Sequence, residues 1–145
     1  MQSFDTLKLL AAVDRELLEQ RCFSFFECLA DQSLDKAMAF IDPQARLTLG
    51  SDTRAMPFYG ARSGADAIRA AFREILIEYD VLHQDIRDVL LDGDRAVVRR
   101  ICRMRHRGTG KVMNVDFCDW IQFQDGLMSE LIFVPDTLPL VELVA

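Results

Sequence analysis

The second half of the chain consists of four extended segments separated by short turns, and this pattern constrains the fold more than any other feature. The segments cover about residues 81–91, 95–106, 112–123 and 127–134. The turns between them are Asp92-Gly93-Asp94, Gly108-Thr109-Gly110 and Asp125-Gly126. Glycine, aspartate and asparagine tolerate the positive φ angles of tight hairpins. The pattern therefore predicts four strands in an antiparallel meander.

The first half of the chain begins with helical patterns. Asp5 can cap a helix that runs to about Ala12, and a longer helix is predicted from Asp14 to Asp31. Apolar residues cover nearly all of the longer helix outside one polar stripe. We therefore expect this helix to pack on more than one side.

Two further helices and a short strand are predicted before the meander. A helix over residues 34–41 ends at Asp42-Pro43, because the residue before a proline avoids the helical conformation, and residues 45–49 alternate weakly like a strand. Ser63-Gly64-Ala65-Asp66 is a variant of a capping box and predicts the start of another helix. The apolar stripe of that helix comprises Ile68, Ala71, Phe72, Ile75, Leu76 and Tyr79. This order predicts an α+β fold in which helices cover the inner face of a curved antiparallel sheet, with an apolar pocket at its open end.

Length and charge limit the organisation of the chain and its partners. At 145 residues the chain has the usual size of one domain, so we expect a single domain over residues 1–145. The net charge of −6 repels nucleic acid and anionic membranes, so neither is expected as a partner. No apolar stretch approaches the roughly 20 residues of a membrane helix, and the amino-terminal residues do not resemble a signal peptide. These features favour a cytoplasmic protein.

Residue patterns for metal, nucleotide or hydrolase chemistry are missing from the sequence. Its four cysteines form no C-x-x-C pair and it has two histidines, so we expect reduced thiols and no metal site. It contains no G-x-S-x-G elbow, no Walker motif and no H-E-x-x-H motif. We therefore expect no cofactor.

Three local motifs carry a resemblance to a known family. They are Pro57-Phe58-Tyr59-Gly60 with Gly64 leading into Ala67-Ile68-Arg69-Ala70-Ala71-Phe72, then Asp92-Gly93-Asp94-Arg95-Ala96-Val97-Val98, then Asp125-Gly126-Leu127-Met128 with Asp136-Thr137. In this order the chain, over about residues 14–143, resembles the SnoaL-like branch of the nuclear transport factor two-like superfamily, which also holds ketosteroid isomerases, polyketide cyclases and dehydratases. The resemblance implies a cone-shaped α+β barrel with a deep apolar pocket, often dimeric through the outer face of the sheet. It implies no single reaction, because this fold hosts many.

The resemblance extends to the site residues only in part. Asp119 falls where it implies the protonated aspartic acid of the isomerases, which donates a hydrogen bond to a developing oxyanion. The base of the isomerases would lie near Thr48-Leu49, where this chain has no carboxylate. Phe25 and Ala30 stand where the dehydratases carry a tyrosine and an aspartate.

Asp119 also stands out on physical grounds. Strand alternation places it on the same face as Phe117 and Ile121, and desolvation by such neighbours would raise the pKa of its carboxyl. A carboxyl of this kind can act as a general acid or an oxyanion donor. Alternatively, Asp119 is a structural acid satisfied by Arg100, His106 or backbone amides. Both interpretations stay open at this point.

The remaining candidates are a histidine, a set of pocket walls and a group of arginines. His106 is either a base in the pocket or a partly exposed strand end. The expected pocket walls are Phe23, Phe26, Tyr59, Phe72, Leu76, Phe117 and Ile132. The arginines either hold an anion or form a solvated ladder with acids on neighbouring strands; they are Arg95, Arg99, Arg100, Arg103, Arg105 and Arg107.

Two functions follow as hypotheses. The first is a SnoaL-like enzyme that performs cofactor-independent proton transfer, such as cyclisation, isomerisation or dehydration, on an apolar oxygenated substrate, with Asp119 and His106 as catalytic candidates. The second is a non-catalytic module of the same fold that binds a small apolar ligand or acts as a dimeric interaction module. A second titratable group facing Asp119 across the pocket would favour the enzyme. Trp120 alternates to the outer face of the sheet, so a homodimer through that face is expected.

Overall fold

The computed structural model describes the backbone of residues 4–50 and 60–145, and the side chains of residues 14–50 and 60–145. The helices in these ranges are α1 (Phe4–Ala30), α2 (Leu34–Met38), α3 (Ala65–Glu78) and α4 (Thr137–Val144). The strands are β1 (Ile41–Leu49), β2 (Gly60–Ser63), β3 (Tyr79–Asp92), β4 (Arg95–His106), β5 (Val112–Gln124) and β6 (Leu127–Phe133). The predicted α+β class is confirmed.

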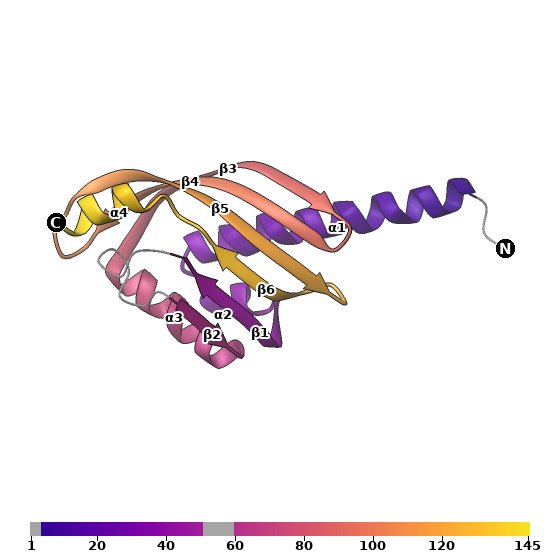
Figure 1. Cartoon of the computed structure of the whole chain (residues 1–145), viewed down its shortest axis with the longest axis horizontal. Helices are drawn as coiled ribbons and strands as arrows, with labels where there is room; N and C mark the ends of the chain where they lie inside the picture. Colours follow the sequence, from indigo (N-terminus) through magenta and orange to yellow (C-terminus); the bar gives the residue numbers. More distant parts are fainter. Residues whose placement is uncertain (1–3, 51–59) are drawn as a thin grey trace.

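All of these strands belong to one curved sheet in the order β2-β1-β6-β5-β4-β3. The predicted antiparallel meander is confirmed for β3 to β6, whereas β1 pairs in parallel with β6. Because β2 and β3 form the two edges, the sheet is an open, curved sheet within the described residues rather than a closed barrel. Figure 1 shows the sheet curving over α1, with α3 beside β1 and β2 and with α4 at the end where the C-terminus lies.

Helix α1 is one continuous helix, so the predicted division near residue 13 is wrong. Residues 4–30 contain no glycine or proline, and nothing in this stretch stops a helix once it has started. The amino-terminal part of α1 extends beyond the sheet (Figure 1). No helix in the described residues is long and apolar enough to cross a membrane.

The boundary between α2 and β1 also differs from the prediction. The helix ends at Met38, and β1 begins at Ile41 and continues through Pro43. Its pairing with β6 is irregular between Ile41 and Arg46, and such an irregularity lets a strand include a proline that cannot donate a ladder hydrogen bond. Strand β2 was not predicted.

Helix α3 has the predicted apolar stripe but starts differently. Ser63 ends β2, and the N-cap is Gly64, without a side-chain capping bond, so the predicted capping box is wrong. Gly64 has a φ of 89°, which favours glycine, and its N–H donates to the carbonyl of Ala45. This bond ties the start of α3 to β1. The stripe is confirmed, since Ile68 and Phe72 are buried.

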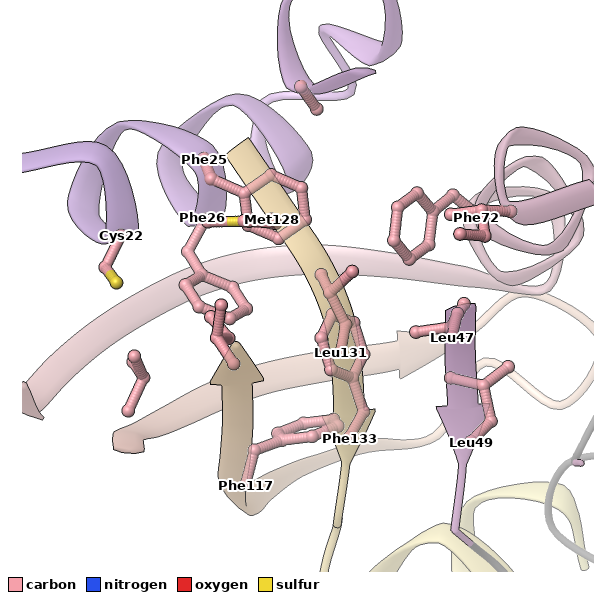
Figure 2. Close-up of a cluster of buried hydrophobic side chains, with 14 of the residues drawn as sticks. Cys22, Phe25, Phe26, Leu47, Leu49, Phe72, Phe117, Met128, Leu131 and Phe133 are labelled. Atoms are coloured by element: carbon pink, nitrogen blue, oxygen red, sulfur yellow. The ribbon is translucent and has the colours of Figure 1, made fainter. Parts of the chain in front are cut away.

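The core between helices and sheet contains a cluster of aromatic rings among aliphatic side chains (Figure 2). Phe25 and Phe26 of α1 meet edge to face with ring centroids 5.0 Å apart. Phe72 of α3 stacks on Phe133 of β6 at 5.9 Å. Contacts between Phe25 and Phe72 and between Phe26 and Phe133 join these two pairs. The cluster therefore fixes both helices against the concave face of the sheet.

Replacing Phe25 by alanine tests this packing. Phe25 is fully buried, so Phe25→Ala should lower the free energy of unfolding by about 3–5 kcal/mol in urea denaturation. The control is Ile77→Ala on α3, whose side chain is 62% exposed, and it should change stability by about 0.5 kcal/mol or less. Equal losses in the two variants would contradict the described core.

Candidate functional site

A cavity lies on the concave side of the sheet, beside the aromatic core. Its volume is about 60 Å³, taken as the space in which the centre of a water-sized sphere fits. The helices contribute Leu29, Ala30, Phe72, Ile75, Leu76 and Leu140 to its lining. The strands and the segment after β6 contribute Leu49, Tyr79, Val81, Gln84, Arg100, Cys102, Met104, Phe117, Phe133 and Pro135. Most of these side chains are apolar, so the few polar groups decide which ligand orientation is stable.

Arg100 is the charged side chain among the described residues that line this cavity. Alternation along β4 turns it inward with Val98 and Cys102, whereas Arg99 points outward. Only 6% of Arg100 is exposed. The Cζ atom of its guanidinium lies 4.1 Å from the ring centroid of Phe117, 4.6 Å from that of Phe26 and 5.3 Å from that of Phe133. These cation–π contacts hold a charged group within an apolar wall.

The hydrogen bonds of the guanidinium fix its orientation. Nε donates to Oδ2 of Asp119 at 2.6 Å, and Nη1 donates to Oε1 of Gln84 at 3.2 Å and contacts Sγ of Cys102 at 3.4 Å. The Gln84 amide is itself held, because its Nε2 donates to the carbonyl of Phe26 at 3.1 Å. Nη2 has no acceptor within residues 14–50 and 60–145, yet it is not fully buried. As far as the described residues go, a ligand can therefore accept from its two N–H groups.

Asp119 and Arg100 form a buried ion pair. Burial raises the pKa of the Asp119 carboxyl, and the adjacent Arg100 opposes part of that rise. Burial also opposes the charge on Arg100, but the contacts with Asp119 and Cys102 together outweigh it, and the pKa of the guanidinium is raised. The raised pKa of Asp119 favours its neutral form, whereas the raised pKa of Arg100 favours its charged form. Because the guanidinium keeps its charge and the 2.6 Å contact is that of a charge-assisted hydrogen bond, we treat the pair as ionised near neutral pH.

The second oxygen of Asp119 is buried, and no described residue is its hydrogen-bond partner. Oδ1 accepts no hydrogen bond from the described residues. The backbone of Val134 also lowers the pKa of the carboxyl, by less than Arg100 does. Asp119 is fully buried and lies behind Arg100, outside the set of described lining residues. Of the two members of the ion pair, Arg100 is therefore the one that lines the cavity.

Two further titratable groups line the cavity, and both stay protonated near neutral pH. Burial raises the pKa of Tyr79 to about 12, with a smaller contribution from Glu78. Burial also raises the pKa of the Cys102 thiol, although Arg100 opposes part of the rise. Neither group is a ready proton acceptor at neutral pH.

The structure brings together only some of the expected pocket walls. Phe72, Leu76 and Phe117 line the cavity, and Phe26 packs against the Arg100 guanidinium. Phe23 lies outside the cavity lining, and Tyr59 lies outside the described residues.

Ile132 also lies away from the cavity, on the outer face of the sheet. It pairs with Trp120, and the adjacent Phe133 takes the inward position. The pairing of β5 with β6 skips Ser129, so β6 contains one extra residue there. Such an extra residue reverses which positions of a strand face inward.

His106 lies at the end of β4, outside the described cavity lining. Its Nε2 is 3.1 Å from Glu78, and its Nδ1 is 3.2 Å from the hydroxyl of Thr109. That hydroxyl donates to the carbonyl of Leu143 in α4. His106 thus links the ends of α3, β4 and α4.

The other arginines of β4 and the turn after it differ from Arg100. Arg99 pairs with Asp116, and Arg105 and Arg107 pair with Asp80, all at half-exposed positions. They form the solvated cross-strand pairs expected of this stretch. The sequence pattern places Arg100 in the same group of arginines. Its spacing of two from the inward residues Val98 and Cys102 is the signal that distinguishes it from the outward-facing arginines.

An open, mostly antiparallel sheet curved over helices is the fold that this chain shares with solved nuclear transport factor two-like proteins. The chain belongs to the SnoaL-like domain family, since the model of that family matches residues 24–131.

Solved structures share the fold of this chain. A Rhodopseudomonas palustris protein with a provisional isomerase assignment is 25% identical, with a TM-score of 0.76 over 84% of this chain and 93% of that one. A nuclear transport factor two-like protein of unknown function from Burkholderia pseudomallei is 18% identical, with a TM-score of 0.78 over 89% and 98%. TerC, crystallised with polyporic acid, is 16% identical, with a TM-score of 0.74 over 88% and 98%. No curated protein matches the chain.

Removing Arg100 tests the buried pair. Arg100→Met leaves the Asp119 carboxylate buried without a cation, so the free energy of unfolding at pH 7 should fall by about 3–5 kcal/mol. The matched control is Arg99→Met, which breaks the half-exposed pair with Asp116 on the other face and should cost about 1 kcal/mol or less.

The pH dependence of the variant identifies the cause. A carboxyl whose folded-state pKa is raised contributes most to stability when it is protonated, and it loses this contribution as the pH rises through the folded-state pKa. Without Arg100 the main opposition to the effect of burial on the Asp119 pKa is lost, so the stability deficit of Arg100→Met should shrink between pH 7 and pH 5. A deficit that does not depend on pH would contradict an unpaired Asp119 charge.

Proposed function

We propose that this protein binds an apolar small molecule through an oxygen atom that accepts a hydrogen bond from Arg100. The observation that carries the proposal is the open Nη2 group of a charged, immobilised guanidinium at an otherwise mainly apolar cavity wall. Asp119 and Gln84 hold the other nitrogens, so the donor is positioned before a ligand arrives. The carbon skeleton of the ligand would lie against Phe72, Leu76 and Phe117.

Proton-transfer catalysis is a second candidate function at the same site. In this candidate a C–H bond beside a carbonyl breaks, its proton passes to a base, and the electron pair moves onto the carbonyl oxygen at Arg100. Asp119 is the proposed proton acceptor, and its unpartnered Oδ1 and raised pKa favour this role. His106 remains a proposed second acid–base group. Because Asp119 lies behind Arg100, the arginine side chain must shift before the carboxyl can reach a ligand.

One probe tests both candidates. The ketone 2-acetylnaphthalene is apolar, carries one carbonyl oxygen and has exchangeable methyl hydrogens beside it. It is larger than the cavity of about 60 Å³, so the apolar walls must move apart to admit it. Calorimetry should show saturable binding to the wild type and about tenfold weaker binding to the double variant Arg100→Gln/Asp119→Asn, because a hydrogen bond to a charged group is lost. The double variant removes both charges together, so it leaves no unpaired charge in the core.

Deuterium exchange then separates binding from catalysis. If the protein transfers protons, the methyl hydrogens of 2-acetylnaphthalene should exchange in D₂O faster with the wild type than with the double variant, as followed by proton NMR. Binding without faster exchange favours the non-catalytic module. No saturable binding by the wild type, or equal binding by the double variant, would contradict the proposed role of Arg100.

We also propose a homodimer through the outer face of the sheet. Four apolar residues lie in one cross-strand row there: Leu90, Val97, Trp120 and Ile132. Trp120 is 52% exposed and Leu90 is 65% exposed in the single chain. Polar and charged residues flank the row on both sides, as in an interface with an apolar centre and a polar rim. A second copy related by a twofold axis would cover the row.

Trp120→Glu tests the dimer. Light scattering after size exclusion, at about 10 μM, should show a dimer for the wild type and a monomer for this variant, because a buried unpaired carboxylate opposes association. Ile77→Glu changes an exposed residue on α3, outside the row, and should remain dimeric. A monomeric wild type would overturn the proposal.

A further inference from the structure

The Arg100–Asp119 pair leaves the polar part of the cavity close to electrically neutral. Asp119 contributes one negative charge 2.6 Å from the guanidinium, and both side chains are buried. Gln84, the other side chain that accepts from the guanidinium through oxygen, is uncharged. Cys102 and Tyr79 stay protonated near neutral pH because burial raises the pKa of each.

Within residues 14–50 and 60–145, the elements around the cavity add no charge that would offset an additional anion. The side chains that α1, α3 and α4 contribute to the described lining are apolar, as are Phe117 of β5 and Phe133 of β6. Among the described residues, the neighbouring charged pair of Arg99 and Asp116 lies on the opposite face of the sheet. Among the described residues, Asp119 is therefore the group that balances the charge of Arg100.

We infer that Asp119 determines the charge of the ligand: by neutralising Arg100 it makes the cavity select uncharged oxygen-bearing molecules, such as ketones, over carboxylates of the same shape. This inference rests on the proposed function and adds the class of ligand. A carbonyl oxygen at Nη2 gains a hydrogen bond without changing the net charge of the site. A carboxylate there would place two negative charges around one guanidinium in an apolar surrounding, and like charges interact strongly when water is excluded.

The opposite selectivity follows when the charge of Asp119 is removed. An asparagine keeps an oxygen that can accept from Nε of Arg100, so the guanidinium can stay in place. The site then carries an uncompensated positive charge, which a carboxylate neutralises better than a ketone. Asp119 acts here through Arg100 and does not touch the ligand, so it is a specificity-determining residue in this role.

Two ligands of nearly equal shape test the inference, 2-acetylnaphthalene and 2-naphthoate, with dissociation constants measured by calorimetry at pH 7.5. The wild type should bind the ketone at least about tenfold more tightly than the carboxylate, a difference of about 1.4 kcal/mol. In Asp119→Asn the ratio of the two constants should move toward the carboxylate by at least about tenfold. If Asp119 had only a structural role, Asp119→Asn would weaken the binding of both ligands equally and leave the ratio of the two constants unchanged.

The control is Asp116→Asn, which removes the acid paired with Arg99 on the outer face and should leave the ratio as in the wild type. Equal binding of the two ligands by the wild type would overturn the inference while the proposed function stands, and this measurement does not depend on whether Asp119→Asn folds. A folded Asp119→Asn protein with an unchanged ratio would also overturn it. Failure of the wild type to bind either ligand would instead count against the proposed function.

Discussion

The hydrogen-bonded ion pair between Arg100 and Asp119 is the interaction on which the site depends. Each charge alone would be strongly unfavourable in a core of phenylalanine rings, and the 2.6 Å contact makes both acceptable. The pair also fixes the guanidinium by one edge, while the rings of Phe26 and Phe117 lie close to its Cζ atom. The free edge at Nη2 is what remains to meet a ligand.

The fold supplies this pair through strand alternation on two neighbouring strands. Arg100 on β4 is directly paired with Phe117 on β5, and Asp119 follows two residues later on the same inward face. Phe72 and Phe133, which stack on each other in the aromatic cluster (Figure 2), also line the cavity. A polar anchor within an apolar space suits a ligand that is mostly hydrocarbon with one oxygen.

Local chemistry in the sequence was sufficient to predict the meander and the buried position of Asp119. Turn residues mark the hairpins, and alternation of polar and apolar residues marks the inward face of β5. The parallel pairing of β1 with β6 could not be predicted in this way, because it joins segments far apart in the chain. The extra residue Ser129 has no strong local signal. The continuity of α1 does have one, because residues 4–30 contain no glycine or proline that would divide the helix. The inward position of Arg100 could be predicted from strand alternation. The five neighbouring arginines instead suggested that it belongs to a solvated ladder.

A crystal structure with bound 6-bromo-2-acetylnaphthalene tests the central claim most directly, because the bromine fixes the orientation of the ligand by its anomalous signal. The account predicts the carbonyl oxygen at about 3 Å from Nη2 of Arg100, with Nε still bonded to Asp119 and the rings against Phe72 and Phe117. A ligand bound outside this cavity, or bound inside it with its oxygen away from Arg100, would contradict the account.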